Sequence, residues 1–286
     1  MSTALDDVAF LANSENRVAA LRLLVERPRS HDEIREEIGA SRVTTARILR
    51  EFEAREWIAR SGQDCTITDT GAWVGEAFED LLEEMAAERR LREPLQWMPV
   101  EDLPFDVRRL RDAELVVREE SDATAVFRRI IEFRRSGDRV RGLARMVAPV
   151  FIENDWEATV QGDTSLEMVV TPDVLEVIRT HPTSARQLRE MLEQSNVHVG
   201  VTPDVPLSLT IVDGAVGVDG TDDEGVVKGG FVSEDDVVYG WAVDQFESAR
   251  ADATPVSPED VEAEPSEGAS SSSGRDENPR QNGAAQ

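Results

Sequence analysis

The sequence has 286 residues, with 58 acidic against 31 basic side chains and a net charge of −27 at pH 7. That charge excludes a protein that binds nucleic acid over its whole surface. No apolar run approaches the roughly 20 residues that span a bilayer, and no signal peptide opens the chain. A single cysteine, Cys65, excludes an internal disulfide and a cysteine-based zinc site. We therefore expect a cytoplasmic protein without a membrane partner.

The charge is unevenly distributed along the chain. Up to Gly62, ten arginines stand against eleven acids, so almost all of the negative charge lies downstream. Only this first segment can approach a phosphate backbone without strong repulsion. Lys228 is the only lysine, and abundant acids with scarce lysine resemble the proteins of extreme halophiles. The alternative is an acidic protein of a mesophile.

The first segment predicts three helices in succession. Leu5–Leu11 is a short leading helix, and Ser14 begins a second helix that stops before Pro28. Ser30 and Glu33 have the spacing of a capping box at the start of a third, short helix.

The next stretch predicts a turn, a longer helix and a hairpin. Gly39 suits the left-handed residue that ends the short helix, and Ser41 suits the N-cap of the next. One face of that helix is a stripe of residues that pack inward, namely Thr45, Ile48, Leu49 and Phe52. Two short strands follow, at 56–60 and 65–68, with the turn 61–64 between them.

This order of elements resembles a winged helix-turn-helix, whose second helix enters the major groove of DNA. The helix and the wing supply the residues that we predict to contact DNA: Ser41, Arg42, Thr44, Thr45, Arg47, Arg50, Arg60 and Gln63. The alternative is a winged helix that has lost DNA binding and serves as a protein-interaction module.

A longer helix follows the wing, with Thr68 or Thr70 as its cap and its end by Pro94. Its apolar residues form a broader face than a small domain needs: Trp73, Phe78, Leu81, Leu82, Met85 and Leu91. Two explanations stay open. The helix forms a homodimer that matches a palindromic operator, or it packs against the next domain.

Beyond a linker at 95–104, strand and helix patterns alternate from 105 to 250. We predict strands at 112–117, 140–144, 165–170, 197–201, 207–212, 215–218 and 226–231, and helices at 122–135, 172–180, 184–194 and 235–250, with helix or loop at 147–160. From 251 to 286 the chain has eight acids, a serine run and no periodicity, which predicts a disordered acidic tail.

The two halves also resemble a known family. Residues 1–92 resemble the winged helix of archaeal regulators, particularly those of haloarchaea. The segments 202–207 (TPDVPL), 209–214 (LTIVDG) and 241–246 (WAVDQF) resemble the sensor-like domain of methanogenesis-regulator-type proteins. The resemblance implies transcriptional regulation, with a second domain that dimerises or binds a small-molecule effector of unknown identity.

The residue pattern gives no support for an enzyme or a cofactor. Phospholipase D chemistry, found on a related fold, needs a histidine with a lysine two residues later, and Lys228 is distant from His31, His181 and His198. The three histidines also lack the spacing of a zinc site. For Cys65 we favour a packing role over that of a redox sensor.

One cluster of the second domain has the residue type for an anionic effector. It comprises Arg134, Arg135, Arg139, Arg141 and Arg145. We favour the simpler explanation, in which these arginines neutralise nearby acids. The predicted fold class is therefore α+β: a winged helix-turn-helix, an α/β effector-like domain and the acidic tail.

Overall fold

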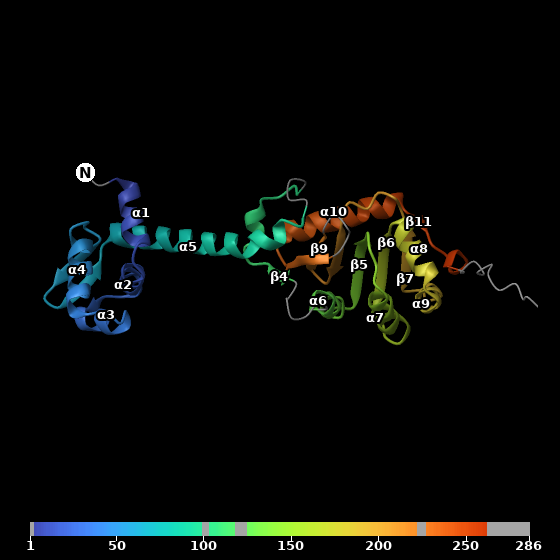
Figure 1. Ribbon diagram of the computed structural model, residues 1–286, viewed down its shortest axis with the longest axis horizontal. Helices are drawn as coiled ribbons and strands as arrows, with labels where there is room; N and C mark the ends of the chain where they lie inside the picture. Colours follow the sequence, from blue (N-terminus) through green and yellow to red (C-terminus); the bar gives the residue numbers. More distant parts are fainter. Residues whose placement is uncertain (1–2, 99–102, 118–124, 222–226, 262–286) are drawn as a thin grey trace, which may run out of the picture. The chain divides into compact units, whose positions relative to one another are not determined.

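The computed structural model describes residues 3–98, 103–117, 125–221 and 227–261. The chain divides into two compact units (Figure 1). The winged-helix unit comprises Met1–Glu93 with Leu110–Asp112, and the sheet unit comprises Pro94–Arg109 with Ala113–Gln286. In the described ranges, no helix has the length and apolar character to cross a membrane.

The winged-helix unit has the helices and strands that its sequence predicts, with one short strand in addition. Its elements are α1 (Ala4–Ala12), α2 (Glu15–Glu26), β1 (Arg29–Ser30), α3 (His31–Glu37), α4 (Arg42–Glu53), β2 (Ile58–Ser61), β3 (Asp64–Ile67) and α5 (Asp69–Leu95). The strands form an antiparallel sheet in the order β1-β3-β2. The unpredicted β1 is too short to leave a periodic pattern.

Local chemistry sets the boundaries of α3 and α4. The Ser30 backbone N–H donates to the Glu33 carboxylate at 2.7 Å, and the Glu33 N–H donates to the Ser30 hydroxyl at 3.2 Å. This capping box is the predicted one, and the hydrogen bonds lower the pKa of Glu33 to about 2. Gly39 adopts the left-handed conformation (φ 63°), which a residue with a Cβ rarely adopts, and so turns the chain from α3 into α4.

The wing begins two residues later than expected. Glu56 has a left-handed φ of 59°, and Trp57 is buried in the core between α4 and the wing, so β2 starts at Ile58. The Thr68 hydroxyl donates to the Trp57 carbonyl at 3.0 Å and accepts from the Gly71 N–H at 3.0 Å. Thr68, rather than Thr70, therefore caps α5. A Cβ on Gly71 would lie 1.9 Å from the Trp57 carbonyl oxygen, so only glycine permits this packing.

The sheet unit is built on eight strands in the order β11-β7-β6-β5-β8-β9-β10-β4. The strands are β4 (Glu114–Val117), β5 (Arg139–Ala144), β6 (Ser165–Val170), β7 (Val197–Val201), β8 (Ser208–Val212), β9 (Ala215–Thr221), β10 (Val227–Ser233) and β11 (Thr254–Pro255). The helices are α6 (Ala125–Arg134), α7 (Pro149–Val160), α8 (Pro172–Thr180), α9 (Pro182–Leu192) and α10 (Asp236–Asp252), with the short 3-10 helices η2 (Val107–Leu110) and η3 (Pro258–Val261).

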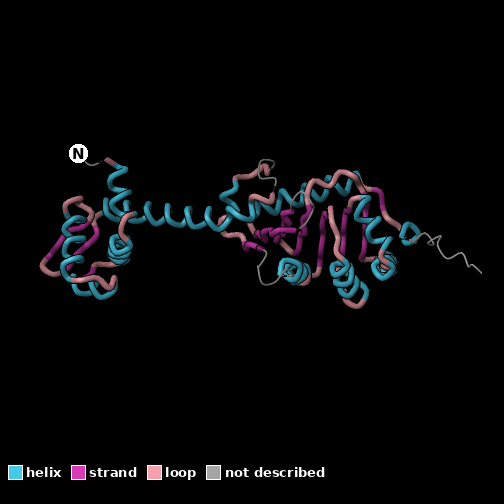
Figure 2. The backbone as a smooth tube through the Cα atoms, viewed as in Figure 1, coloured by secondary structure: helices cyan, strands magenta, loops and turns pink. Residues whose placement is uncertain are grey.

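Helices cover both faces of this sheet (Figure 2). Strands β5, β6 and β7 are parallel and are joined through α7 and through α8–α9, whose apolar residues cover one face. Helix α10 packs on the other face, against β5, β8 and β9. Strands β8, β9 and β10 are antiparallel, and Asp213-Gly214 forms the predicted tight turn between β8 and β9. The sheet changes from parallel to antiparallel pairing between β5 and β8.

The described part of the predicted tail is structured, which corrects the expected boundary at 251. Helix α10 continues to Asp252, Thr254 of β11 pairs with Val201, and Val261 is buried in the core. The composition of this stretch is polar because most of its side chains are exposed, while its backbone completes the sheet edge. Residues 262–286 of the tail, and the predicted helix start before Ala125, lie outside the described residues.

Candidate nucleic-acid interface

Helix α4 has one buried and one exposed face. Thr45, Ile48, Leu49 and Phe52 belong to the core of the winged-helix unit, as the spacing predicts. Arg42, Arg47 and Arg50 are exposed on the other side. With a rise of 1.5 Å per residue, these arginines span about 12 Å along the helix, which is close to the width of the major groove.

These three arginines differ from the other arginines of the segment that ends at Gly62. The other seven each have a carboxylate within 4.0 Å: Arg17 with Glu51, Arg22 with Glu79, Arg27 with Glu33, Arg29 with Glu26, Arg35 with Glu36, Arg55 with Asp7 and Arg60 with Glu53. Within the described residues, none of the α4 arginines has such a partner. Arg50 donates only to the Ala46 carbonyl of its own helix, at 3.3 Å. Helix α4 therefore presents three positive charges that no acid of the described ranges pairs with.

The polar residues at the start of α4 serve the helix itself. The Ser41 hydroxyl accepts from the Thr44 N–H at 3.1 Å and lies 2.9 Å from the Thr44 hydroxyl. Thr45 is 0% exposed, and its hydroxyl donates to the Ser41 carbonyl at 3.1 Å. Thr45 thus corrects the predicted DNA-contacting set, because core packing removes it from the surface.

The two predicted wing residues lie on the hairpin. Arg60 is on β2, with its Nε 3.4 Å from the Glu53 carboxylate. Gln63 follows Gly62 in the two-residue turn, and its carbonyl accepts from the His31 N–H at 3.1 Å. The wing tip is therefore tied to the start of α3, which fixes its position relative to α4.

One exposed residue of α4 is absent from the predicted set. Val43 is 78% exposed, one of the largest exposures among the apolar side chains of the chain. It lies one turn before Arg47 on the same face. Apolar contact with a thymine methyl group is one way that a recognition helix reads sequence. A valine outside the apolar stripe of an amphipathic helix is the signal that could have identified it.

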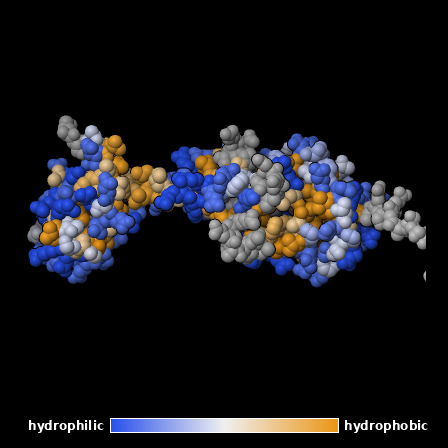
Figure 3. Space-filling model, viewed as in Figure 1, coloured by the Kyte–Doolittle hydropathy of each residue, from blue (hydrophilic) through white to orange (hydrophobic). Residues whose placement is uncertain are grey.

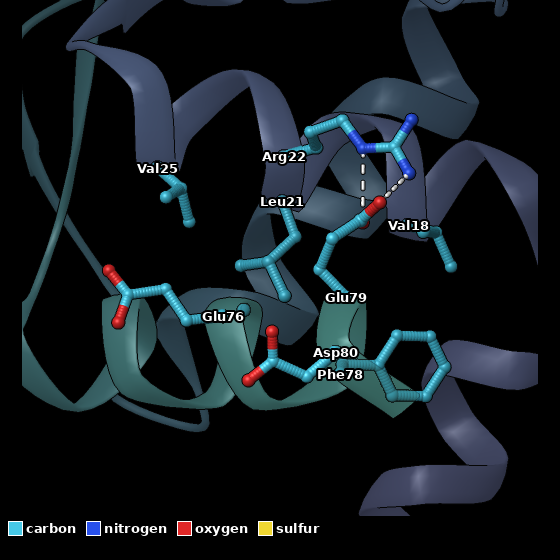
Figure 4. Close-up of a pocket in the computed structure, with 9 residues that line it drawn as sticks. Val18, Leu21, Arg22, Val25, Glu76, Phe78, Glu79 and Asp80 are labelled. Atoms are coloured by element: carbon cyan, nitrogen blue, oxygen red, sulfur yellow. Dashed lines mark hydrogen bonds and ion pairs between the residues drawn. The ribbon is translucent and has the colours of Figure 1, made fainter. Parts of the chain in front are cut away.

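A groove lies between α2 and α5 of the winged-helix unit (Figure 4). Its volume is about 210 Å³, and Val18, Leu21 and Val25 of α2 form its apolar side. Glu76, Glu79 and Asp80 line the α5 side, and Arg22 is paired with Glu79 at 3.1 Å. This acidic rim does not suit a phosphate backbone.

Helix α5 exposes an apolar stripe. Trp73 (74% exposed), Leu81 and Met85 recur at helical spacing, with Leu82 beside them. Figure 3 shows hydrophobic side chains over the first part of this helix. Phe78 faces the other way, into the core of the winged-helix unit. Of the apolar face that the sequence predicts for this helix, only part is buried inside the winged-helix unit, and the rest is exposed.

The arginine cluster of the sheet unit does not converge on one site. Each member has its own partner: Arg134 with Asp155, Arg135 with Glu157, Arg139 with Glu167, Arg141 with Glu247 and Tyr239, and Arg145 with the Pro206 carbonyl. Neutralisation of neighbouring groups, the simpler of the two predictions, describes this arrangement. Only the Arg134 pair is buried.

Cys65 has the surroundings of a residue with a packing role. Cys65 is buried in the core of the winged-helix unit, and burial raises the pKa of its thiol, which lowers the thiolate fraction at neutral pH. Among the described residues, no group of three or more His, Cys, Asp or Glu side chains could hold a metal ion.

Two family models match the chain, one in each unit. Residues 5–90 match the HVO_A0261 N-terminal domain, and residues 123–252 match the middle domain of the methanogenesis regulatory protein FilR1. These matches confirm the resemblance that the sequence motifs predict. No match was found among curated proteins.

Several solved structures are similar to parts of the chain. TrmBL2, an archaeal chromatin protein with a novel mode of DNA binding, is 14% identical, covers 86% of this chain and 98% of its own, and has a TM-score of 0.40. Quinone-bound YodB from B. subtilis is 22% identical over 30% of this chain and 98% of its own, with a TM-score of 0.28. The phospholipase D family member Nuc from Salmonella typhimurium is 12% identical over 51% of this chain and 97% of its own, with a TM-score of 0.40. Likenesses at these TM-scores carry no conclusion about function.

Proposed function

Because the chain carries an HVO_A0261-type N-terminal domain and a FilR1-type middle domain, we propose that it is a sequence-specific transcriptional regulator that binds double-stranded DNA as a homodimer. Helix α4 enters the major groove, and the sheet unit has a regulatory role. We place the protein in the cytoplasm, where DNA is accessible to it.

The observation that carries this proposal is the set of unpaired arginines on α4. An arginine that is paired with a carboxylate must give up that partner before it binds a phosphate or a base. Within the described residues, Arg42, Arg47 and Arg50 have no such partner to lose, since the nearby Glu51 and Glu53 pair with Arg17 and Arg60. Their guanidinium groups have the fork geometry for bidentate bonds to guanine or to phosphate.

The other contacts follow from position along the same face. Ser41 and Thr44 lie at the amino-terminal end of α4, where side chains of a recognition helix reach base edges. Val43 is placed to touch a thymine methyl group. Arg60 and Gln63 on the wing contact the DNA backbone or the minor groove.

The dimer forms through the exposed stripe of α5. A twofold-symmetric contact joins identical surfaces, and a stripe of Trp73, Leu81 and Met85 can pack against its own copy. We expect Trp73→Glu to turn the dimer into a monomer in sedimentation velocity, because it places a charge in the apolar contact. Leu5→Glu on α1, another exposed apolar position, is the matched control and leaves the dimer intact. A Trp73→Glu protein that sediments as a dimer would assign dimerisation to another surface.

The composition indicates operation in concentrated salt. At about 1 M salt the Debye length is about 3 Å, so the repulsion between the acidic chain and DNA is screened. The same salt removes most of the affinity that counterion release provides. Contacts with base edges and a close fit to the shape of the DNA therefore supply more of the specificity here than in a regulator that works in dilute salt.

The test is a selection of random duplex DNA by the full chain in molar KCl. We expect a palindromic consensus with half-sites about one helical turn apart. Arg42→Ala and Arg47→Ala should each weaken binding to that consensus by about 1–3 kcal/mol. Arg22→Ala, which removes an arginine paired with Glu79 away from α4, is the control and keeps the affinity. Enrichment of no sequence would favour the protein-interaction module.

A further inference from the structure

One glutamate of α4 has the sequence spacing to pair with an arginine of the same helix. Glu51 is four positions after Arg47, and side chains at this spacing are neighbours on the surface of a helix. In the structure, however, the Glu51 carboxylate lies 3.2 Å from Nη2 of Arg17 on α2. Arg47 has no carboxylate within 4.0 Å among the described residues. A residue outside α4 therefore determines which arginine Glu51 neutralises.

The second acid of α4 has the same arrangement. Glu53 is three positions after Arg50, but its carboxylate lies 3.4 Å from Nε of Arg60 on β2. Glu51 and Glu53 are the only acids in the sequence of α4. Both therefore pair with arginines of other elements, while the arginines of α4 have no carboxylate partner in the described ranges.

Several contacts hold the Arg17 side chain against α1 and α4. Its Nη1 donates to the Phe10 carbonyl at 2.8 Å, and its guanidinium carbon lies over the Phe10 ring, 4.0 Å from the ring centre. Its Nη2 donates to the Glu51 carboxylate. The Arg17 side chain is only 17% exposed, compared with 32% for Glu51. Rotation of Arg17 away from Glu51 would therefore break its contacts with α1 as well.

This placement of Arg17 has a cost for the fold. Its Nε is buried and has no hydrogen-bond partner within the described residues. A buried donor without a partner destabilises the folded state, because it has given up its hydrogen bond to water. A partly exposed ion pair, for its part, adds little to stability. Stability alone is therefore a weak reason for the Arg17–Glu51 pair.

A third arginine is near Glu51 in sequence, but it has another partner. Arg55 is four positions after Glu51, and its Nε donates to the Asp7 carboxylate at 3.0 Å. From Glu51 it takes only the backbone carbonyl, to which its Nη1 donates at 3.2 Å. Without Arg17, Arg47 is therefore the neighbour whose guanidinium is free to pair with the Glu51 carboxylate.

We propose that Arg17 is a positioning residue for DNA binding: it holds Glu51 away from Arg47 and so keeps Arg47 free to bind DNA. This inference rests on the proposed function, in which Arg47 contacts a base or a phosphate. When Arg17 is absent, Glu51 pairs with Arg47, and DNA must displace Glu51 before Arg47 binds. Arg17 itself acts through Glu51 and needs no contact with DNA.

The experiment measures binding of full-chain variants to the selected consensus by fluorescence anisotropy over a KCl series. We expect Arg17→Gln to weaken binding about twofold at the lowest salt, which is the effect of one helix ion pair that must break before Arg47 binds. The double variant Arg17→Gln/Glu51→Gln should regain wild-type affinity. Arg22→Gln is the matched control, because it removes another α2 arginine, which is paired with Glu79 at 3.1 Å, and should keep the affinity.

A double-mutant cycle tests whether Arg17 acts through Arg47. In an Arg47→Ala protein, Arg17→Gln should have no further effect on binding, because Glu51 has no DNA-contacting arginine at this position to capture. A role of Arg17 in the fold alone, or a general effect of its charge, would give the same loss in both backgrounds. Thermal unfolding shows whether each variant is folded.

A second measurement needs no DNA, and its first part needs no variant. In NMR spectra of the wild-type chain, the Nε–H group of Arg47 should be mobile, whereas that of Arg17 should be ordered, because Phe10 and Glu51 hold its guanidinium. In Arg17→Gln, the Arg47 group should become ordered. The additional change Glu51→Gln should make it mobile again.

Three results would overturn the proposed role. They are an ordered Arg47 side chain in the wild type, wild-type affinity of a folded Arg17→Gln protein, and equal losses from Arg17→Gln in the wild-type and Arg47→Ala backgrounds. A chain that enriches no DNA sequence but shows the NMR changes loses the proposed function and keeps the exchange of Glu51 between two arginines. A chain that binds its consensus but shows equal losses in the cycle loses only the role of Arg17.

Discussion

Arginines have opposite surroundings in the two units of this protein. On α4, Arg42, Arg47 and Arg50 have no carboxylate partner within the described structure. In the sheet unit, four of the five arginines from 134 to 145 have a carboxylate partner, and the fifth, Arg145, donates to the Pro206 carbonyl. The residue type is the same, and the local sequence is equally rich in arginine. The comparison shows that the supply of nearby acids, rather than the number of arginines, separates a binding surface from a neutralised one.

The sequence around α4 explains the difference. No acid occurs between Glu37 and Glu51, although acids make up 58 of the 286 residues. An arginine on a helix most readily pairs with an acid three or four positions away. Glu51 is four positions after Arg47 and Glu53 is three positions after Arg50, but these two acids pair with Arg17 and Arg60 instead. In the sheet unit, by contrast, α7, β6 and α10 bring Asp155, Glu167 and Glu247 to the arginines.

Removal of the buried arginine should have the largest effect. Arg134→Met leaves the Asp155 carboxylate buried without its partner, and we expect a loss of about 3–5 kcal/mol in the free energy of unfolding. Denaturant titration in molar KCl measures it. Arg139→Met removes an exposed arginine that is paired with Glu167 at 2.9 Å, and should change stability by less than about 1 kcal/mol. The double variant Arg134→Met/Asp155→Leu should regain most of the loss. Equal effects of Arg134→Met and Arg139→Met would contradict the distinction between buried and exposed pairs.

A second carboxylate near Arg134 should make the stability depend on pH. Asp219 lines a small cavity under α6 with Phe133 and Thr210, and burial raises its pKa to about 7, against a partly opposing influence of Arg134. Since its pKa is about 4 in the unfolded chain, the folded state binds more protons between pH 4 and 7, and stability falls as the pH rises through this window. We expect Asp219→Asn to be more stable than wild type at pH 8, by on the order of a few kcal/mol, with the difference shrinking toward pH 4. Thermal unfolding from pH 4 to 8 measures it, and a difference that does not vary with pH would assign the carboxylate an ordinary pKa.

A charge-conserving change on α4 should separate base contacts from phosphate contacts. Arg47→Lys keeps the positive charge and loses the planar fork, so we expect it to weaken binding to the selected consensus by about 1–3 kcal/mol if the guanidinium binds guanine bidentately. The slope of log affinity against log salt should stay unchanged, because no charge is lost. Fluorescence anisotropy over a KCl series measures both quantities. Full affinity with lysine would make Arg47 a phosphate contact.

The smallest effect should come from the apolar residue of the same face. We expect Val43→Ala to weaken consensus binding by about 1 kcal/mol through loss of contact with a thymine methyl group. Replacement of the contacted thymine by uracil removes the methyl group from the DNA instead, and should weaken wild type but not Val43→Ala. An additive effect of the two changes would show that valine and methyl group do not meet.

The sequence alone determined the elements that depend on neighbouring residues. The capping box of Ser30 and Glu33, the left-handed Gly39 and the tight turn at Asp213-Gly214 are all where their patterns predict, because each involves atoms only a few residues apart. The stretch without acids before Glu51 is also local, whereas the pairing of Glu51 with Arg17 depends on the tertiary structure. Thr45 was assigned incorrectly to the DNA-contacting set, although its place in the apolar stripe already indicated burial.

Only the tertiary structure decided the features that join distant segments. Asp155 meets Arg134 across 21 positions, β11 closes the sheet edge with residues whose composition predicts a tail, and Gly142 makes room for the Met168 side chain. Periodicity reports which face of an element is apolar, but not which other element it meets. Those partners are determined by the strand order and the register, which in turn depend on the packing of the whole sheet.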